Sequence, residues 1–167
     1  MARFTQILIR ARHKLGRPRK GKPAHLVLGE RGETEAYFYL KRLGYRFVAT
    51  NVRLPHNRGE IDLIGWDRGV LCFVEVKTRM DDSFAPPSLA VTLQKQRNII
   101  AVAKRYVRRL PGEGRPPCRF DILSIVPTED GSAPQFTLQK GAFDWDAGRP
   151  RQRQYRDFQD RHYWRRR

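Results

Sequence analysis

The 167-residue sequence predicts one α/β domain, a mixed β-sheet flanked by helices, in the order helix, three strands, helix, two strands. Two observations predict this class. A long amphipathic segment separates two groups of strand-like segments, and this division is typical of a mixed sheet with helices packed on it. In addition, residues 70–77 form an almost continuous apolar run, which is typical of a central strand covered on both faces.

The first half of this domain is predicted as a helix followed by three strands. Residues 29–43 carry apolar or small side chains at helical spacing, and Gly44 stands where a glycine commonly ends a helix. Three segments rich in β-branched and aromatic residues follow, and the short Asp67–Gly69 turn makes the last two of them an antiparallel hairpin. We expect these strands over residues 45–54, 60–66 and 70–79.

The second half of the domain is predicted as a long helix followed by two strands. Residues 91–110 repeat apolar side chains at helical spacing, and the proline-containing segment 111–117 ends that helix. Residues 118–126 and 135–139 have the composition of strands. The predicted domain therefore spans residues 29–147.

Most of the excess positive charge lies outside this domain. The chain has a formal net charge of +17, whereas residues 29–147 contain 18 basic and 15 acidic side chains. Residues 1–28 contain eight basic and no acidic residues, and residues 148–167 contain eight arginines and two acids. Such segments repel themselves and have little apolar surface to bury, so we expect both arms to be disordered on their own.

The composition argues against several classes of protein. No apolar run approaches the roughly 20 residues that a transmembrane helix needs, so no membrane partner is expected. The apolar part of the N-terminus, residues 7–9, is too short for a secretory signal, although the Arg-rich, acid-free arm also resembles an organelle transit peptide. Cys72 and Cys118 cannot form a disulfide framework or a cysteine-based zinc site, so a cytoplasmic location is expected.

The two basic arms predict a polyanionic partner, and nucleic acid is the commonest one. In the C-terminal arm, aromatic residues such as Tyr155 and Trp164 are interleaved with arginines. Aromatic rings can stack on unpaired bases while arginines neutralise phosphates, so we expect this arm to bind nucleic acid. The alternative is a solubilising tail with no specific role.

Two acids and a lysine on neighbouring strands form the strongest chemical signal. Glu75 lies inside the apolar run, and Lys77, two residues further on, leaves the same face of the strand. In the predicted hairpin Asp62 can lie across from Glu75, and two close carboxylates repel unless a cation sits between them. Mg²⁺ suits that gap because it prefers oxygen ligands. The alternative is a simple Glu75–Lys77 ion pair at the end of a strand.

Asp62, followed after twelve intervening residues by Glu75-Val76-Lys77, resembles the signature of the PD-(D/E)xK nuclease superfamily. The resemblance is closer to one of its groups, the YraN family of uncharacterised bacterial proteins (uncharacterised protein family 0102), which is similar to archaeal Holliday-junction resolvases. It covers roughly residues 29–144 and neither arm. The residues that carry it are Glu33, Gly44-Tyr45, Asn51, Gly59-Glu60-Ile61-Asp62-Leu63-Ile64, Phe73-Val74-Glu75-Val76-Lys77-Thr78-Arg79, Lys95 and Arg119-Phe120-Asp121.

This resemblance implies a restriction-endonuclease-like fold and a metal-dependent endonuclease that hydrolyses DNA, with branched DNA as a candidate substrate. It implies Mg²⁺ or Mn²⁺ as the cofactor. Asp62 and Glu75 match the metal-binding acids, and Lys77 matches the catalytic lysine. Glu33 matches a helix acid that completes the metal site, often through water. By analogy with the resolvases a homodimer is expected, because cutting two strands needs two sites.

Further basic residues around these acids predict contacts with the nucleic-acid backbone. They are Arg58, Arg79, Lys95 and Arg97. Asp121 lies in a predicted strand, where Asp is disfavoured, so we expect it to pair with Arg119 or to cap the backbone. Two other functions stay open at this point: a nucleic-acid-binding protein that keeps the nuclease fold without its activity, and a structural or ribosome-associated basic protein.

Overall fold

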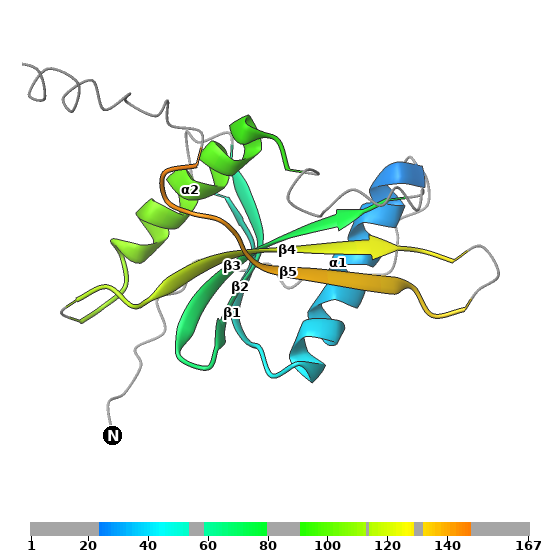
Figure 1. The fold of residues 1–167 in the computed structure, drawn as a ribbon, viewed down its shortest axis with the longest axis horizontal. Helices are drawn as coiled ribbons and strands as arrows, with labels where there is room; N and C mark the ends of the chain where they lie inside the picture. The colour runs from blue at the N-terminus through cyan, green and yellow to red at the C-terminus, as the bar shows by residue number, and fades with distance from the viewer. Residues whose placement is uncertain (1–23, 54–58, 80–90, 113, 129–131, 148–167) are drawn as a thin grey trace, which may run out of the picture.

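The computed structural model describes residues 24–53, 59–79, 91–112, 114–128 and 132–147. These residues form two helices and five strands in the predicted order (Figure 1). The elements are α1 (Ala24–Arg42), β1 (Arg46–Arg53), β2 (Glu60–Asp67), β3 (Val70–Thr78), α2 (Leu93–Val107), β4 (Cys118–Val126) and β5 (Gln135–Phe143). Residues 1–23 and 148–167, which include most of the N-terminal arm and the whole C-terminal arm, lie outside the described residues.

The five strands form one mixed sheet in the order β1-β2-β3-β4-β5. The β2 strand pairs antiparallel with β1 on one side and with β3 on the other, and the β2–β3 pairing confirms the predicted hairpin. The β4 strand pairs parallel to β3, and β5 returns antiparallel to β4. Because two parallel neighbours cannot be joined by a tight turn, α2 serves as the crossover between β3 and β4.

The two helices cover opposite faces of the sheet (Figure 1). Packed against α2 is a cluster that includes Phe73, Ile99 and Phe120, whereas α1 packs on a second cluster that includes Leu40 and Leu123. Alternate residues of β3 and β4 therefore enter different clusters, which explains their continuous apolar sequence. Each fully buried side chain of this size stabilises the fold by about 1.5–3 kcal/mol.

Both helices have well-formed ends. At the end of α1, Gly44 adopts φ +95, and its N–H and that of Tyr45 bond to the carbonyls of Lys41 and Leu40. This is the Schellman arrangement that the position of Gly44 predicts. At the start of α2, the Thr92 hydroxyl accepts a 3.2 Å hydrogen bond from the backbone N–H of Lys95. The cap fixes the first turn of α2.

Two boundaries differ from the sequence prediction by more than three residues, and α2 is shorter than predicted, Leu93–Val107 against residues 91–110. The α1 helix begins at Ala24, five residues before the predicted start, and so includes residues that we assign to the N-terminal arm. The β5 strand continues to Phe143 rather than ending at residue 139, because Gly141 takes φ +63 and Phe143 stacks on Phe120 at 4.8 Å. Neither helix among the described residues is long and apolar enough to cross a membrane.

Candidate functional site

Asp62 and Glu75 come together where β2 and β3 stop pairing. The last pair at this end of the ladder is Leu63–Val74, and Asp62 and Glu75 are the next residues on each strand. Both are buried, with Asp62 8% and Glu75 2% exposed. The Asp62 carboxylate accepts a 2.7 Å hydrogen bond from the backbone N–H of Val76 and so takes the place of a ladder partner. The sequence prediction that these two acids meet is confirmed.

Two lysines from different elements contact Glu75. Its Oε1 atom lies 2.9 Å from Nζ of Lys77, two residues along β3, and 3.1 Å from Nζ of Lys95, in the first turn of α2. The other oxygen, Oε2, is buried and has no hydrogen-bond partner among the described residues. A buried carboxylate oxygen without a partner is costly, and it marks the position where another donor or a cation would be favoured.

The electrostatics of the site reflect two acids held close together. Burial raises the pKa of Asp62 well above its ordinary value, and the charges of Glu75 and Glu33 raise this pKa further. The Val76 N–H and Lys95 oppose this change. Burial lowers the pKa of Lys95, but the attraction of Glu75 and Asp62 outweighs burial, so this pKa is raised overall. Lys95 therefore stays protonated beside the acids.

Glu33 approaches the same site from α1. A Cβ atom at Gly32 would overlap the hydroxyl of Thr78, so α1 lies against the end of β3 at this point. Glu33 is half-buried there, and its charge acts on both Asp62 and Arg53. Within the described part of the chain, however, no three acidic, histidine or cysteine side chains form a metal-binding group. Glu33 therefore lies beside the site and acts on it through its charge.

The side chains at the hairpin end fit a divalent cation on chemical grounds. Two repelling carboxylates, one with an oxygen that has no hydrogen-bond partner within the described residues, supply the hard oxygen ligands that Mg²⁺ and Mn²⁺ accept. Asp62 and Glu75 would hold such an ion directly, and Glu33 would act through water.

The predicted nucleic-acid contacts divide into three groups. Lys95 lies in the site, but its partner in this structure is Glu75. Arg79 is half-buried directly after β3, and its backbone N–H bonds to the carbonyl of Ile125, whereas Arg97 is exposed on α2. The other three predicted contacts, Arg58, Tyr155 and Trp164, lie outside the described residues.

A second cluster of buried charge lies on the α1 face of the sheet. Asp121 is fully buried, and its two oxygens accept hydrogen bonds from Arg119, the Tyr45 hydroxyl and the Gly141 N–H at 2.7–3.0 Å. Arg119 also contacts Asp67, which in turn contacts Lys140. The predicted Asp121–Arg119 pair is confirmed. The remaining members were not predicted, because the pairs that they form are 20 to 76 residues apart in sequence.

Fold and site together define a class: a mixed α/β domain with a buried acid pair and two lysines at the end of its central hairpin. The family model described as Uncharacterised protein family UPF0102 matches residues 32–125, and the chain belongs to that family. A UPF0102 protein of Koribacter versatilis is 40% identical over 140 residues, or 84% of this chain and 94% of the relative. A UPF0102 protein of Symbiobacterium thermophilum is 49% identical over 104 residues, or 62% and 86%. The predicted family is confirmed.

Proposed function

We propose that this protein is a metal-dependent endonuclease that hydrolyses DNA phosphodiester bonds at the Asp62–Glu75 site. The observation that carries the proposal is the environment of Glu75. This acid is buried next to Asp62, two lysines contact one of its oxygens, and the other oxygen has no hydrogen-bond partner among the described residues. A structural ion pair would satisfy both oxygens, whereas a metal site leaves one available.

Each side chain has a role in this proposal. Asp62 and Glu75 would hold Mg²⁺ or Mn²⁺, and such an ion polarises a phosphate and lowers the pKa of bound water. Lys77 would turn from Glu75 to orient the attacking water or a phosphate oxygen. Lys95 would neutralise a nonbridging phosphate oxygen of the strand being cut. Glu33 would hold a water on the α1 side of the site.

The order of elements supports the same proposal. The acids lie on two antiparallel strands and Lys77 follows Glu75 on the same strand, which agrees with the resemblance to PD-(D/E)xK nucleases. A restriction-endonuclease-like fold is proposed on that resemblance. The arms, with 14 of the 17 net positive charges, would supply affinity for the DNA backbone.

One observation favours a second candidate, a nucleic-acid-binding protein without catalysis. Lys77 and Lys95 already neutralise Glu75 in the absence of metal, at 2.9 and 3.1 Å. An ion pair of this kind can hold α2 on the sheet with no cofactor. Metal binding separates the two candidates, because only the nuclease requires it.

The test is cleavage of single-stranded, duplex and branched DNA by the full chain, with Mg²⁺, with Mn²⁺ and with EDTA. We expect cleavage with either metal and none with EDTA. Glu75→Gln keeps the shape of the side chain but removes its charge, and should lower the rate by at least about a thousandfold, because metal stabilisation is worth several kcal/mol. Glu35→Gln, which changes an acid paired with Arg31 on α1, is the matched control and should cleave normally.

Two outcomes would contradict this proposal. Cleavage by Glu75→Gln at the unsubstituted rate would remove the site from the reaction. DNA binding without cleavage of any substrate in either metal would favour the second candidate.

A further inference from the structure

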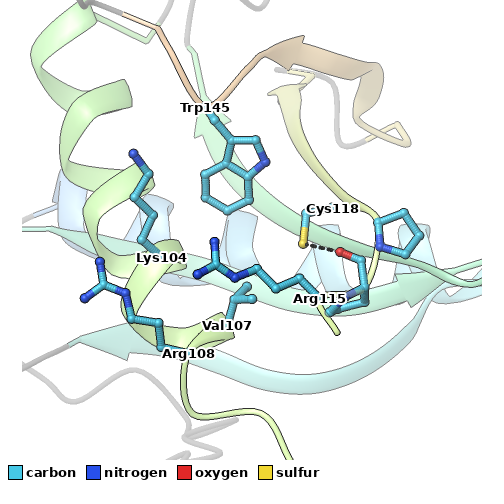
Figure 2. Close-up of a pocket in the computed structure, with 8 residues that line it drawn as sticks. Lys104, Val107, Arg108, Arg115, Cys118 and Trp145 are labelled. Carbon is cyan, nitrogen blue, oxygen red and sulfur yellow. Dashed lines mark hydrogen bonds between the residues drawn. The ribbon is translucent and has the colours of Figure 1, made fainter. Parts of the chain in front are cut away.

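A pocket with a cavity volume of about 530 Å³ lies at the opposite end of α2 from Lys95 (Figure 2). Three separate segments form it: the last turn of α2, the segment that leads into β4, and the residues after β5. The side chains that matter here are Lys104, Val107, Arg108, Arg115, Cys118 and Trp145. A volume in this range can hold a small organic molecule or one unit of a polymer.

Three cations line the pocket, and no acidic residue does. In the described part of the chain, none of Lys104, Arg108 and Arg115 forms an ion pair with a carboxylate. Lys104 and Arg108 also lie at the C-terminal end of α2, where a cation interacts favourably with the helix dipole. That explanation does not apply to Arg115, which comes from another segment and extends toward α2 (Figure 2). Three like charges around one cavity, none of them paired within the described residues, favour an anion.

The remaining wall of the pocket is apolar and aromatic. The Trp145 indole points into the pocket above Arg115 (Figure 2). Edge-to-face packing holds this ring, with centroids 4.8 Å from Phe120 and 6.2 Å from Phe73. The Cys118 thiol donates to the Pro116 carbonyl at 3.2 Å, and Val107 packs in the same wall. A ligand here would therefore need a flat apolar part beside its negative charge.

We propose that this pocket binds one nucleotide unit of a single-stranded nucleic acid, with the phosphate among the three cations and the base against Trp145. Only an unpaired base can turn into a pocket and stack on an aromatic side chain. The proposal goes beyond the nuclease function and does not rest on it. Binding at this pocket requires neither a metal ion nor Asp62 and Glu75, which lie at the other end of α2.

The first test measures binding of a fluorescein-labelled oligothymidylate to the full chain in EDTA, as a function of salt. The variant K104A/R108A/R115A removes the three pocket cations. The control K41A/R42A/R46A also removes three positive charges, two of them from the last turn of α1, and all three side chains are exposed. We expect the pocket variant to lose at least about tenfold in affinity and the log–log salt slope to fall by roughly 0.7, the value for one phosphate contact on a single strand.

The control variant should lose less than about threefold in affinity, because its charges act only at long range. Equal losses in the two triple variants would overturn the proposal, since net charge alone would then explain binding. Arg115→Gln changes a single exposed side chain and should lower affinity about threefold while the thermal unfolding midpoint stays unchanged. No loss in this single variant would also overturn the proposal.

The second test uses Trp145 as the reporter. In W66F/W164F it is the only tryptophan, and stacking of a base should quench its fluorescence on titration with oligothymidylate. Inorganic pyrophosphate should not quench, because it has no base. Thymidine monophosphate should quench only at concentrations at least about a hundredfold higher. Quenching by the mononucleotide and the oligonucleotide at equal concentrations would assign the pocket to a free nucleotide and overturn binding of a strand.

The same titrations in a Glu75→Gln chain separate this inference from the nuclease proposal. Unchanged affinity and quenching would support the pocket even if no DNA cleavage is ever found. Loss of both the affinity and the quenching would place the bound strand at the Asp62–Glu75 site and overturn the proposal that it binds in the pocket.

Discussion

Two clusters of buried charge lie on the sheet, and they differ in how fully their polar groups are satisfied. Around Asp121, on the α1 face, both oxygens of the acid receive hydrogen bonds, and Arg119 joins this acid to Asp67. At the hairpin end, Glu75 is as deeply buried, 2% exposed against 0% for Asp121, yet one of its oxygens has no hydrogen-bond partner in the part of the chain that the structure describes. The two acids are therefore buried to a similar degree, but they differ in how completely their carboxylate oxygens are hydrogen-bonded.

The difference separates a cluster that stabilises the fold from the one that we propose to be functional. A satisfied network contributes to stability and offers nothing to a ligand. A buried acid pair that is incompletely satisfied costs stability in the free protein, and such groups gather at functional sites. Both clusters contain two acids and two cations, so counting charges alone would not distinguish them.

The largest expected effect is on the satisfied cluster. Asp121→Asn removes the charge that pairs with Arg119 and should lower the free energy of unfolding by about 3 kcal/mol, because one partner of a buried pair is then uncompensated. Urea unfolding followed by circular dichroism measures this change. Asp144→Asn, which alters an exposed acid, is the control and should change stability by less than about 0.5 kcal/mol. A similar small loss in Asp121→Asn would contradict the structural role of this cluster.

The next prediction distinguishes the two clusters by how Mg²⁺ changes the stability of variants in each. Mg²⁺ at a hundred times its Kd should raise the free energy of unfolding by about 2.7 kcal/mol, because it binds the folded chain only. We expect this gain in the unsubstituted protein and in Asp121→Asn, and none in Glu75→Gln. Calorimetric melting with and without Mg²⁺ is the measurement. An equal gain in Glu75→Gln would show that the metal binds elsewhere.

A third prediction compares two acids of the same strand, β2, by pH. Hydrogen bonds from Lys140 and Arg119 lower the pKa of Asp67, so its ionised form stabilises the fold above about pH 4. Asp67→Asn should cost about 1.5 kcal/mol at neutral pH, and the loss should vanish as the pH falls through the lowered folded-state pKa.

Asp62 should behave in the opposite way. Burial and the charge of Glu75 raise its pKa in the folded state, so its ionisation above about pH 4 disfavours the fold. Without divalent ions, Asp62→Asn should be more stable than the unsubstituted chain, and the gain should grow as the pH rises toward the raised folded-state pKa. Urea titrations between pH 3 and pH 8 give the change in the free energy of unfolding for Asp67→Asn and for Asp62→Asn. If both changes have the same sign at neutral pH, the comparison is wrong.

The smallest expected effect is on an exposed ion pair, which sets the baseline. Arg31 and Glu35 pair on α1 at 2.9 Å, with the Arg31 side chain 76% exposed. Arg31→Ala should cost only about 0.3–0.5 kcal/mol in urea unfolding, the usual value for such a helical pair. A loss above about 1 kcal/mol would mean that burial does not explain why substitutions in the two clusters cost more free energy of unfolding than this exposed pair.

The hydrophobic pattern predicted the element order, the β2–β3 hairpin and the mixed sheet. Strand composition and turn residues act locally, so they can be read from neighbouring positions. The start of α1 was predicted too late because Pro23, directly before Ala24, was not used as a helix-start signal. The length of β5 was missed because Gly141 is a poor strand residue, and only its tertiary setting keeps it in the ladder.

The candidate site was predicted in part. Asp62, Glu75 and Lys77 lie on one hairpin, so their proximity follows from the turn between the strands. The contact between Lys95 and Glu75 depends on how α2 docks, and only the folded chain shows it. The pocket at the other end of α2 was missed for the same reason. Its cations come from two segments and Trp145 from a third, and each alone has the composition of an ordinary surface.

The parallel pairing of β3 with β4 has a consequence for the order in which the chain folds. The two acids belong to a hairpin and can meet through a short loop, whereas Lys95 reaches Glu75 only when the crossover helix docks. Hairpins form on the microsecond scale, and parallel crossovers close much later. We expect a transient state in which the acids already repel and only Lys77 offsets that repulsion, because Lys95 has not yet arrived. Refolding should therefore be faster at the lower end of the native pH range, where that repulsion is partly titrated away.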